Sequence, residues 1–319
     1  MKNRIRRFIL EGGDFEATAL DLFRWQREHN HPYAAFAGNG PIRHWQDIPA
    51  VPVALFRDVV FGCFPSEQAR IHFRTSGTTV GMRGLHALVD TEIYDLAAEL
   101  HAASCLGGPV PREGISLVPT APDSSLGHMC NRFSPALTPC FSSEGVDVVR
   151  AWHALTQAQT PQFVPGTAFA WDALLARPHD PCPQLPGTVA MVTGGFKGRA
   201  HQLDRPTLLR RIGQMLPGAR VVEEYGMTEL SSQMWAVPAS TPFRPPPWLG
   251  VYTVHPGTGE PSEEGLLRFV DLANHQTVLA IETEDLGRVD HQGRVTLLGR
   301  LTGATPRGCS LTAEEAHGR

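Results

Sequence analysis

The chain has 319 residues, of which 42% are hydrophobic and 19% charged, enough for two modest domains or one large domain with lobes. Its formal net charge of −4 argues against a nucleic-acid partner and against an anionic membrane surface. The apolar run near the N-terminus stops at Glu11, too early for an export signal, and no stretch is long enough to span a membrane, so we expect a cytoplasmic protein.

The first third of the chain is expected to hold two helices, separated by extended chain. Apolar residues at helical spacing predict helices over 14–27 and 91–104, the second with Thr91 as its N-cap. The proline-punctuated stretch 41–66 predicts extended chain, and 71–73 a short strand.

The middle of the chain has the pattern of a parallel sheet with crossover helices. A β-rich run over 188–193, a helix that starts at Asp204 and ends at Gly218, and a strand over 221–224 predict such a crossover unit. The other expected elements are a strand at 115–118, a polar loop at 122–129, a helix over 146–158, and a helix over 168–176 that is opened by 163–166.

The composition changes near residue 235. Prolines between 238 and 247 predict a stiff linker, and short strands are expected after it at 249–254, 265–270, 278–283 and 293–298. We therefore expect an α/β core over 1–236 and a small antiparallel β lobe over 237–319.

One turn, residues 75–84, is rich in hydroxyls and glycine and is expected between the strand at 71–73 and the helix at 91–104. Its backbone N–H groups, its hydroxyls and Arg83 together predict a phosphate cradle. It is not the common P-loop, because GxxxxGK[ST] is absent. On composition alone, a plain solvated loop is the alternative.

Two later stretches have side chains suited to the rest of a nucleotide. Tyr225 begins a Tyr-Gly-Met-Thr-Glu run after a predicted strand; its ring suits a base, Thr228 a phosphate and Glu229 a magnesium ion. Asp285 ends a strand and can accept hydrogen bonds from a ribose diol. Ordinary turn residues are the alternative reading for both stretches.

The C-terminal stretch 299–310 has two cations and a cysteine. Arg300 can reach a phosphate or a carboxylate, and Arg307 lies two residues before Cys309, which favours the thiolate of that cysteine. An inert buried thiol is the alternative for Cys309. No pair of the six cysteines has CxxC spacing, which excludes zinc-ribbon and thioredoxin-type sites, and free thiols are expected.

The order of these motifs resembles the adenylate-forming superfamily, which includes acyl-CoA synthetases, adenylation domains and luciferases. The stretches 124–129, 193–199, 246–249, 266–274 and 307–311 resemble its acyl-protein synthetase branch, the LuxE type, from about Trp45 onward. The resemblance implies the superfamily's N-terminal-domain fold, an α/β arrangement of mixed and parallel sheets with flanking helices. It also implies a fatty acid activated as acyl-AMP by ATP and Mg²⁺ and then captured by a thiol.

The resemblance also implies roles for individual residues. Tyr225 would stack on the adenine, with Gly226 among the nucleotide-binding residues. Asp285 and Arg300 would bind the ribose and Thr228 a phosphate, while Glu229 would hold Mg²⁺ and Cys309 would accept the acyl group. The other implied nucleotide contacts are the phosphate-binding residues Thr75, Ser76, Gly77, Thr78, Thr79 and Arg83, and Gly194 and Gly195 along the adenine.

The sequence departs from the superfamily pattern at Val80, Met82, Arg83 and Glu284. The superfamily's mobile C-terminal domain and its catalytic lysine are expected to be missing, with Lys197, Arg300 or another protein in the place of that lysine. His128 is expected to line the acyl pocket, to act near the substrate carboxylate, or to have a structural role.

Three functions stay open on these residues. The first is an acyl-protein synthetase whose partner is a fatty-acid reductase or an acyl carrier protein. The second is an acyl- or aryl-CoA ligase. The third is a non-catalytic nucleotide-binding subunit of another enzyme.

Overall fold

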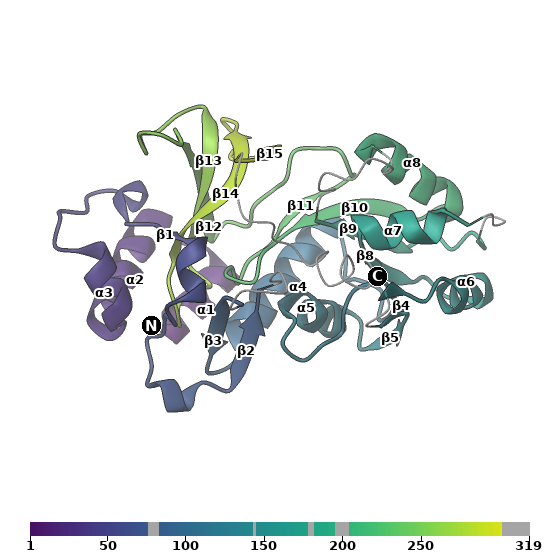
Figure 1. Cartoon of the computed structure of the whole chain (residues 1–319), viewed down its shortest axis with the longest axis horizontal. Coiled ribbons are helices and arrows are strands. Elements are labelled where there is room, and N and C mark those ends of the chain that lie inside the picture. Colours follow the sequence, from purple (N-terminus) through teal and green to yellow (C-terminus); the bar gives the residue numbers. More distant parts are fainter. Residues whose placement is uncertain (76–82, 143–144, 178–181, 195–203, 302–319) are drawn as a thin grey trace.

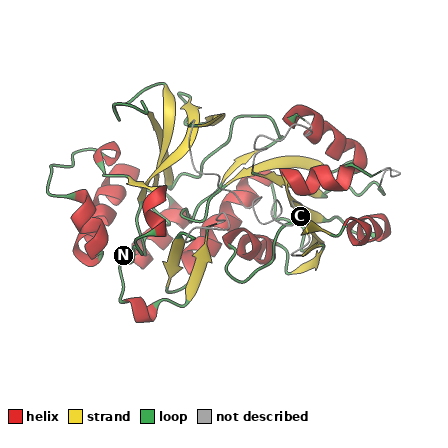
Figure 2. Cartoon of the chain, in the orientation of Figure 1, coloured by secondary structure: helices red, strands yellow, loops and turns green. Residues whose placement is uncertain are grey.

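The computed structural model describes residues 1–75, 83–142, 145–177, 182–194 and 204–301, and it is organised around two sheets (Figures 1 and 2). Among these residues, no helix is both long and apolar enough to cross a bilayer. The larger sheet has six strands in the order β11-β10-β9-β8-β4-β5, all parallel except β11. Its strands are β4 (Glu113–Ser116), β5 (Ala136–Pro139), β8 (Phe163–Thr167), β9 (Val189–Thr193), β10 (Arg220–Tyr225) and β11 (Met234–Ala236).

Helices cover both faces of this six-stranded sheet, as Figure 1 shows. One face packs on α6 (Val148–Gln157), α7 (Ala168–Leu175) and α8 (Arg205–Met215) in one hydrophobic cluster, and the other packs on α4 (Glu92–Leu106) and α5 (Ser125–Phe133) in a second. Because both faces are covered, β8 and β9 are buried along their whole length, as is typical of parallel strands. The expected α/β core with crossover helices is confirmed.

The smaller sheet is mostly antiparallel. Its strands are β12 (Leu249–Val254), β13 (Glu264–Asp271), β14 (Ala280–Val289) and β15 (Val295–Arg300), joined by the short parallel strand β1 (Val51–Pro52). The start of β14 pairs with β1 and its end with β15, so the long strand β14 holds both. The four expected strands are confirmed; the fifth comes from the proline-rich stretch 41–66.

The N-terminal helices pack against this smaller sheet. α1 (Lys2–Glu11), α2 (Phe15–His29) and α3 (His31–Ala37) share one hydrophobic cluster with β12–β15, in which Phe23, Val51 and Phe269 are buried. The hydrophobic cores thus group the start of the chain with its C-terminal sheet, whereas a division at residue 236 separates them in sequence. That division stays a prediction.

Two local expectations are wrong, each for a visible reason. Residues Leu85–Leu88 form β3, antiparallel to β2 (Ile71–Arg74), so no helix directly follows the 75–84 turn. The expected loop at 122–129 begins α5, because the Ser124 hydroxyl accepts a hydrogen bond from the Gly127 N–H at 3.0 Å. The helix expected over 168–176 is confirmed as α7, which is capped by Thr167, and the residues 163–166 before it belong to β8.

The remaining short elements are η1 (Trp45–Asp47), η2 (Val53–Arg57), η3 (Ser66–Gln68) and the pair β6 (Phe141–Ser142) and β7 (Gly145–Val146).

Candidate active site

Three residues expected to contact the nucleotide meet where the two sheets approach each other. The Tyr225 hydroxyl, at the end of β10, donates a hydrogen bond to Asp285 Oδ2 at 2.8 Å. Asp285 Oδ1 forms an ion pair with Arg300 Nε at 2.8 Å, and Arg300 also binds Glu284 Oε2 at 3.2 Å. Asp285 and Arg300 are direct partners across β14 and β15, so the sheet register places them side by side. A carboxylate has about four acceptor positions, so Asp285 can accept further hydrogen bonds.

The environment of Tyr225 fixes the state of its hydroxyl and the use of its ring. Burial, followed by the nearby Asp285 carboxylate, raises the pKa of Tyr225 well above its ordinary value, so the hydroxyl remains a donor. The ring stacks on Phe269 with centroids 5.8 Å apart, and Phe243 meets it edge-on at 6.2 Å. An adenine that stacks on Tyr225 therefore uses the face opposite Phe269.

Buried polar side chains hold the loop that carries Thr228 and Glu229. His86 on β3 bonds through Nδ1 to the Thr228 carbonyl at 2.6 Å, and the Asn274 side-chain N–H group donates to the Glu229 carbonyl at 2.8 Å. Because a carbonyl only accepts, His86 Nδ1 carries a proton and Nε2 accepts from the Thr277 hydroxyl, 3.0 Å away. Burial lowers the pKa of His86 to about 4, so the ring is neutral. The sequence analysis missed His86, which carries no motif; Asn274 ends one of the stretches behind the resemblance.

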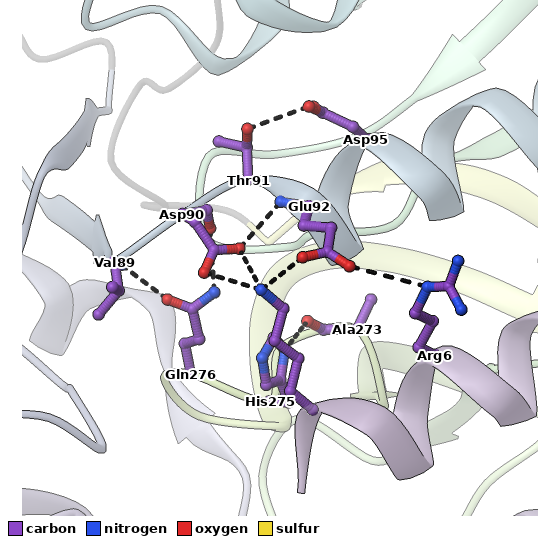
Figure 3. A network of polar contacts seen from close by, with 10 residues as sticks. Arg6, Val89, Asp90, Thr91, Glu92, Asp95, Ala273, His275 and Gln276 are labelled. Atoms are coloured by element: carbon purple, nitrogen blue, oxygen red, sulfur yellow. Dashed lines mark hydrogen bonds and ion pairs between the residues drawn. The ribbon is translucent and has the colours of Figure 1, made fainter.

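The turn 271–277 between β13 and β14 anchors this loop to the rest of the molecule. Asp271 accepts hydrogen bonds from the Ser231 N–H at 3.0 Å and the Ser232 hydroxyl at 2.7 Å, and burial raises the pKa of Asp271 to about 6. Gln276 accepts from the Val89 N–H at 2.7 Å and donates to the Asp90 carbonyl at 2.9 Å (Figure 3). Buried backbone and side-chain groups must find partners, and this turn finds them in segments far away in the sequence, such as 229–232 and 86–90, which makes it a rigid support.

An ion-pair cluster ties the same region to the N-terminal helix. Lys2 Nζ lies 3.0 Å from Asp90 Oδ2 and 2.7 Å from Glu92 Oε2, and Arg6 approaches Glu92 at 3.7 Å (Figure 3). These pairs are partly exposed, so their contribution to stability is small.

The expected phosphate cradle is described only at its two ends. Thr75 Oγ1 accepts from the Gly84 N–H at 2.8 Å, and the Thr75 N–H donates to the Gly84 carbonyl at 2.9 Å, which closes the β2–β3 hairpin below the turn. Arg83 lies 3.8 Å from Asp123 Oδ2. The strands on either side of this stretch are thus paired with each other, and no helix directly follows it in the sequence. Ser76, Gly77, Thr78 and Thr79 lie outside the described residues.

The glycine pair after β9 is described at its first member only. Gly194 has φ +69°, a conformation that favours glycine, and its carbonyl accepts from Arg205 at 2.8 Å. Gly195, Lys197 and Cys309 lie outside the described residues, so their roles stay predictions.

His128 pairs with a carboxylate between α4 and α5. Its Nε2 donates to Asp95 Oδ1 at 2.6 Å, and Asp95 Oδ2 accepts from the Thr91 hydroxyl at 3.0 Å. The imidazole packs on Phe73 and Tyr94, with ring centroids 5.4 and 5.6 Å away. Asp95 therefore fixes both the tautomer and the orientation of His128, the arrangement seen for histidines that act as bases.

A magnesium ion fits the donor set only with help from substrate. Among the described residues no group of three or more His, Cys, Asp or Glu side chains is arranged to hold a metal. Mg²⁺ is commonly held by one or two carboxylates together with substrate phosphates and water, so the single carboxylate of Glu229, a buried residue, is compatible with it.

No protein-family model matches the sequence, and no curated protein sequence matches it. Solved structures do match in fold. o-Succinylbenzoate CoA synthetase (MenE) from Bacillus subtilis in complex with AMP has 17% identity and a TM-score of 0.51 over 72% of this chain and 49% of that chain. VinN in complex with L-aspartate has 18% identity and a TM-score of 0.51 over 72% of this chain and 60% of that one. The luciferase-like enzyme of the mealworm Zophobas morio has 15% identity and a TM-score of 0.51 over 73% of this chain and 57% of that chain.

The fold is that of the N-terminal domain of adenylate-forming enzymes. The matched part of this chain spans about half to three fifths of the length of these structures. At such low identity the match establishes the fold, and activity, substrates and partners are proposals.

Proposed function

We propose that the protein activates a carboxylic acid with ATP as an acyl adenylate, releasing pyrophosphate, and then passes the acyl group to a thiol. The observation that carries this proposal is the assembly of Tyr225, Asp285 and Arg300 at the meeting point of two sheets. Tyr225 offers a ring on which a base can stack, Asp285 offers hydrogen-bond acceptors for a ribose diol, and Arg300 offers a positive charge. ATP-bound and AMP-bound neighbours share the fold.

The residues of this chain bind and orient the reactants in this proposal. Tyr225 stacks on the adenine, Asp285 accepts from the ribose hydroxyls, and the 75–84 turn with Arg83 contacts the phosphates. Arg300 offsets the repulsion between the substrate carboxylate and the phosphates of ATP, two anionic groups that must approach each other during adenylation. A magnesium ion held by Glu229 would offset phosphate charge, and the rigid support under Thr228 and Glu229 keeps that carboxylate in place.

The second step transfers the acyl group. The thiolate sulfur attacks the acyl carbonyl, the bond from that carbon to the AMP oxygen breaks, and AMP leaves with the electron pair. We propose Cys309 as the acceptor, with a reductase or an acyl carrier as the next recipient, in the manner of the LuxE-type synthetases that the sequence resembles. Coenzyme A is the second candidate thiol, supported by a MenE structure that holds the analogue OSB-NCoA.

Thioester trapping tests the acceptor. The protein is incubated with ATP, Mg²⁺ and radiolabelled acids, separated under denaturing, non-reducing conditions, and digested for mass spectrometry. Label on the peptide that contains Cys309, absent in Cys309→Ser and released by hydroxylamine, is the expected result. Label that persists in Cys309→Ser contradicts this acceptor, and formation of acyl-CoA by Cys309→Ser supports the ligase instead.

A further inference from the structure

A buried carboxyl group lies where β9 and β10 leave the core, next to the proposed nucleotide site. On the sheet face covered by α4 and α5, Met191 and Val222 belong to the hydrophobic cluster. Two residues further along each strand, on the same face, stand Thr193 and Glu224, which are direct partners across the strands. The Thr193 hydroxyl donates to Glu224 Oε2 at 2.5 Å, and both residues are buried.

The second oxygen of this carboxyl group lies against a glycine. A Cβ built on Gly226 would meet Glu224 Oε1 and stand 3.3 Å from Gln233 Cγ, so any larger residue here would force the Glu224 carboxyl group to move. Gly226 itself is exposed, whereas Glu224 and Gln233 are each 4% exposed. The two polar side chains therefore flank the bare backbone of an exposed residue, directly after Tyr225.

Both side chains keep an acceptor without a donor. Gln233 donates through Nε2 to the Tyr94 hydroxyl at 3.4 Å, but its Oε1 is buried and has no hydrogen-bond partner. Among the described residues, the hydrogen bond from Thr193 goes to Oε2 of Glu224, and none donates to Oε1. An unpaired buried acceptor such as Gln233 Oε1 is costly, and such a group in a native protein calls for a ligand, a water or an ion. Burial raises the pKa of Glu224 to about 7, which shows how poorly its charge is compensated.

We propose that Glu224 and Gln233 bind the ammonium group of the acid that the protein activates, so that its substrate is an amino acid. An ammonium has three donors and a positive charge, and it satisfies both acceptors while compensating the carboxylate. A hydroxyl group has one donor and no charge, and an alkyl chain has neither. The inference rests on the proposed adenylation and replaces the fatty acid that the resemblance predicts.

The test is ATP–pyrophosphate exchange with matched acids. Each set contains an α-, β- or ω-amino acid, the hydroxy acid of the same length and the unsubstituted acid. The expected result is a preference for one amino acid, and a fall in that preference of roughly 10- to 100-fold in Glu224→Gln, as for loss of a charged hydrogen bond. A smaller fall is expected in Gln233→Met.

The matched control is Glu223→Gln. Glu223 is also buried, but it points to the other face, where Arg205 and the Ser240 N–H bind it. Its replacement is expected to leave the preference among acids unchanged, whatever it does to stability.

Two outcomes overturn the inference, and a third separates it from the proposed function. Best exchange with unsubstituted acids overturns it, as does an amine preference that survives Glu224→Gln. If no acid supports exchange, the proposed function fails, and thermal shift without ATP then decides the site. An amino acid that raises the melting temperature of the wild type but not that of Glu224→Gln supports the site. If every amino acid tested affects the two proteins equally, the site is refuted.

Discussion

The hydroxyl of Tyr225 donates a 2.8 Å hydrogen bond to the carboxylate of Asp285, and this bond links the end of β10 in the large sheet to β14 in the small one. Asp285 is held from its other side by Arg300. The two halves of the proposed nucleotide site are therefore positioned against each other by the residues that would bind the nucleotide.

Tyr225→Phe keeps the ring and removes this bond. We expect a loss of about 1.5–3 kcal/mol in the free energy of unfolding, measured in urea, together with a several-fold rise in KM for ATP. Tyr252→Phe is the matched control, because the Tyr252 hydroxyl donates to the Gln46 carbonyl at 3.1 Å on another part of the small sheet. It should change stability alone; an equal rise in KM in both variants would contradict the assignment.

His86 makes stability depend on pH on the acid side. Its pKa is about 4 in the folded state and near 6.5 when unfolded, so the unfolded state binds the proton more tightly and stability falls as pH drops from about 6.5 to about 4. His86→Gln should remove up to about 3 kcal/mol of that dependence, measured by urea unfolding at several pH values. His101→Gln, whose histidine also has a pKa near 4, should act similarly on stability.

A kinetic readout separates the two histidines. Only His86 bonds to the loop that carries Glu229, so only His86→Gln should raise the Mg²⁺ concentration needed for half-maximal activity. His101 bonds instead to the Arg244 carbonyl. An unchanged Mg²⁺ requirement in His86→Gln would mean that the support under this loop has no effect on the site.

Glu224 should have the opposite pH effect. Its pKa rises from 4.5 to about 7 on folding, so the folded state binds the proton more tightly and stability falls as pH rises through that window. Glu224→Gln should therefore stabilise the protein relative to wild type by up to about 3 kcal/mol near pH 8 and by little near pH 4. Melting temperatures across this range measure it, and a constant difference between the two proteins would refute the buried, uncompensated carboxyl.

The pair formed by Asp95 and His128 should matter for chemistry rather than for folding. Asp95→Asn keeps the size of the side chain but removes the charge that orients His128, and we expect roughly a tenfold or greater loss in the rate of acyl transfer to the thiol. Glu99→Gln, on the same helix and paired with Arg132, is the control. Equal rates for both variants in single-turnover thioester formation would assign His128 a structural role.

Much of the fold follows from local patterns in the sequence. The helix capped by Asp14 and the strand, helix and strand around Asp204 were predictable because apolar periodicity and capping residues agree there. The strand β3 was not, since Leu85–Leu88 is short and becomes a strand only by pairing with β2. The start of α5 was missed because its small polar residues are equally typical of a loop.

The candidate site was predictable only where a motif carries it. Tyr225, Asp285 and Arg300 were proposed as nucleotide contacts; the register of β14 and β15 places Asp285 beside Arg300, and the Tyr225 hydroxyl bonds to Asp285 from the other sheet. His86 and Gln233 were not proposed, because their importance comes from burial and from partners more than a hundred residues away. Long-range pairing of this kind leaves no local pattern in the sequence.

The account depends most on adenylation, and ATP–pyrophosphate exchange measures that step directly. With purified protein, Mg²⁺ and labelled pyrophosphate, we predict label in ATP only when a carboxylic acid is present. Asp285→Asn should abolish most of this exchange. Glu282→Gln should retain it, because Glu282 lies on the same strand as Asp285 but its carboxylate binds Arg268 on β13. Exchange that does not depend on any acid, or cleavage of ATP to ADP and phosphate instead, would contradict the account.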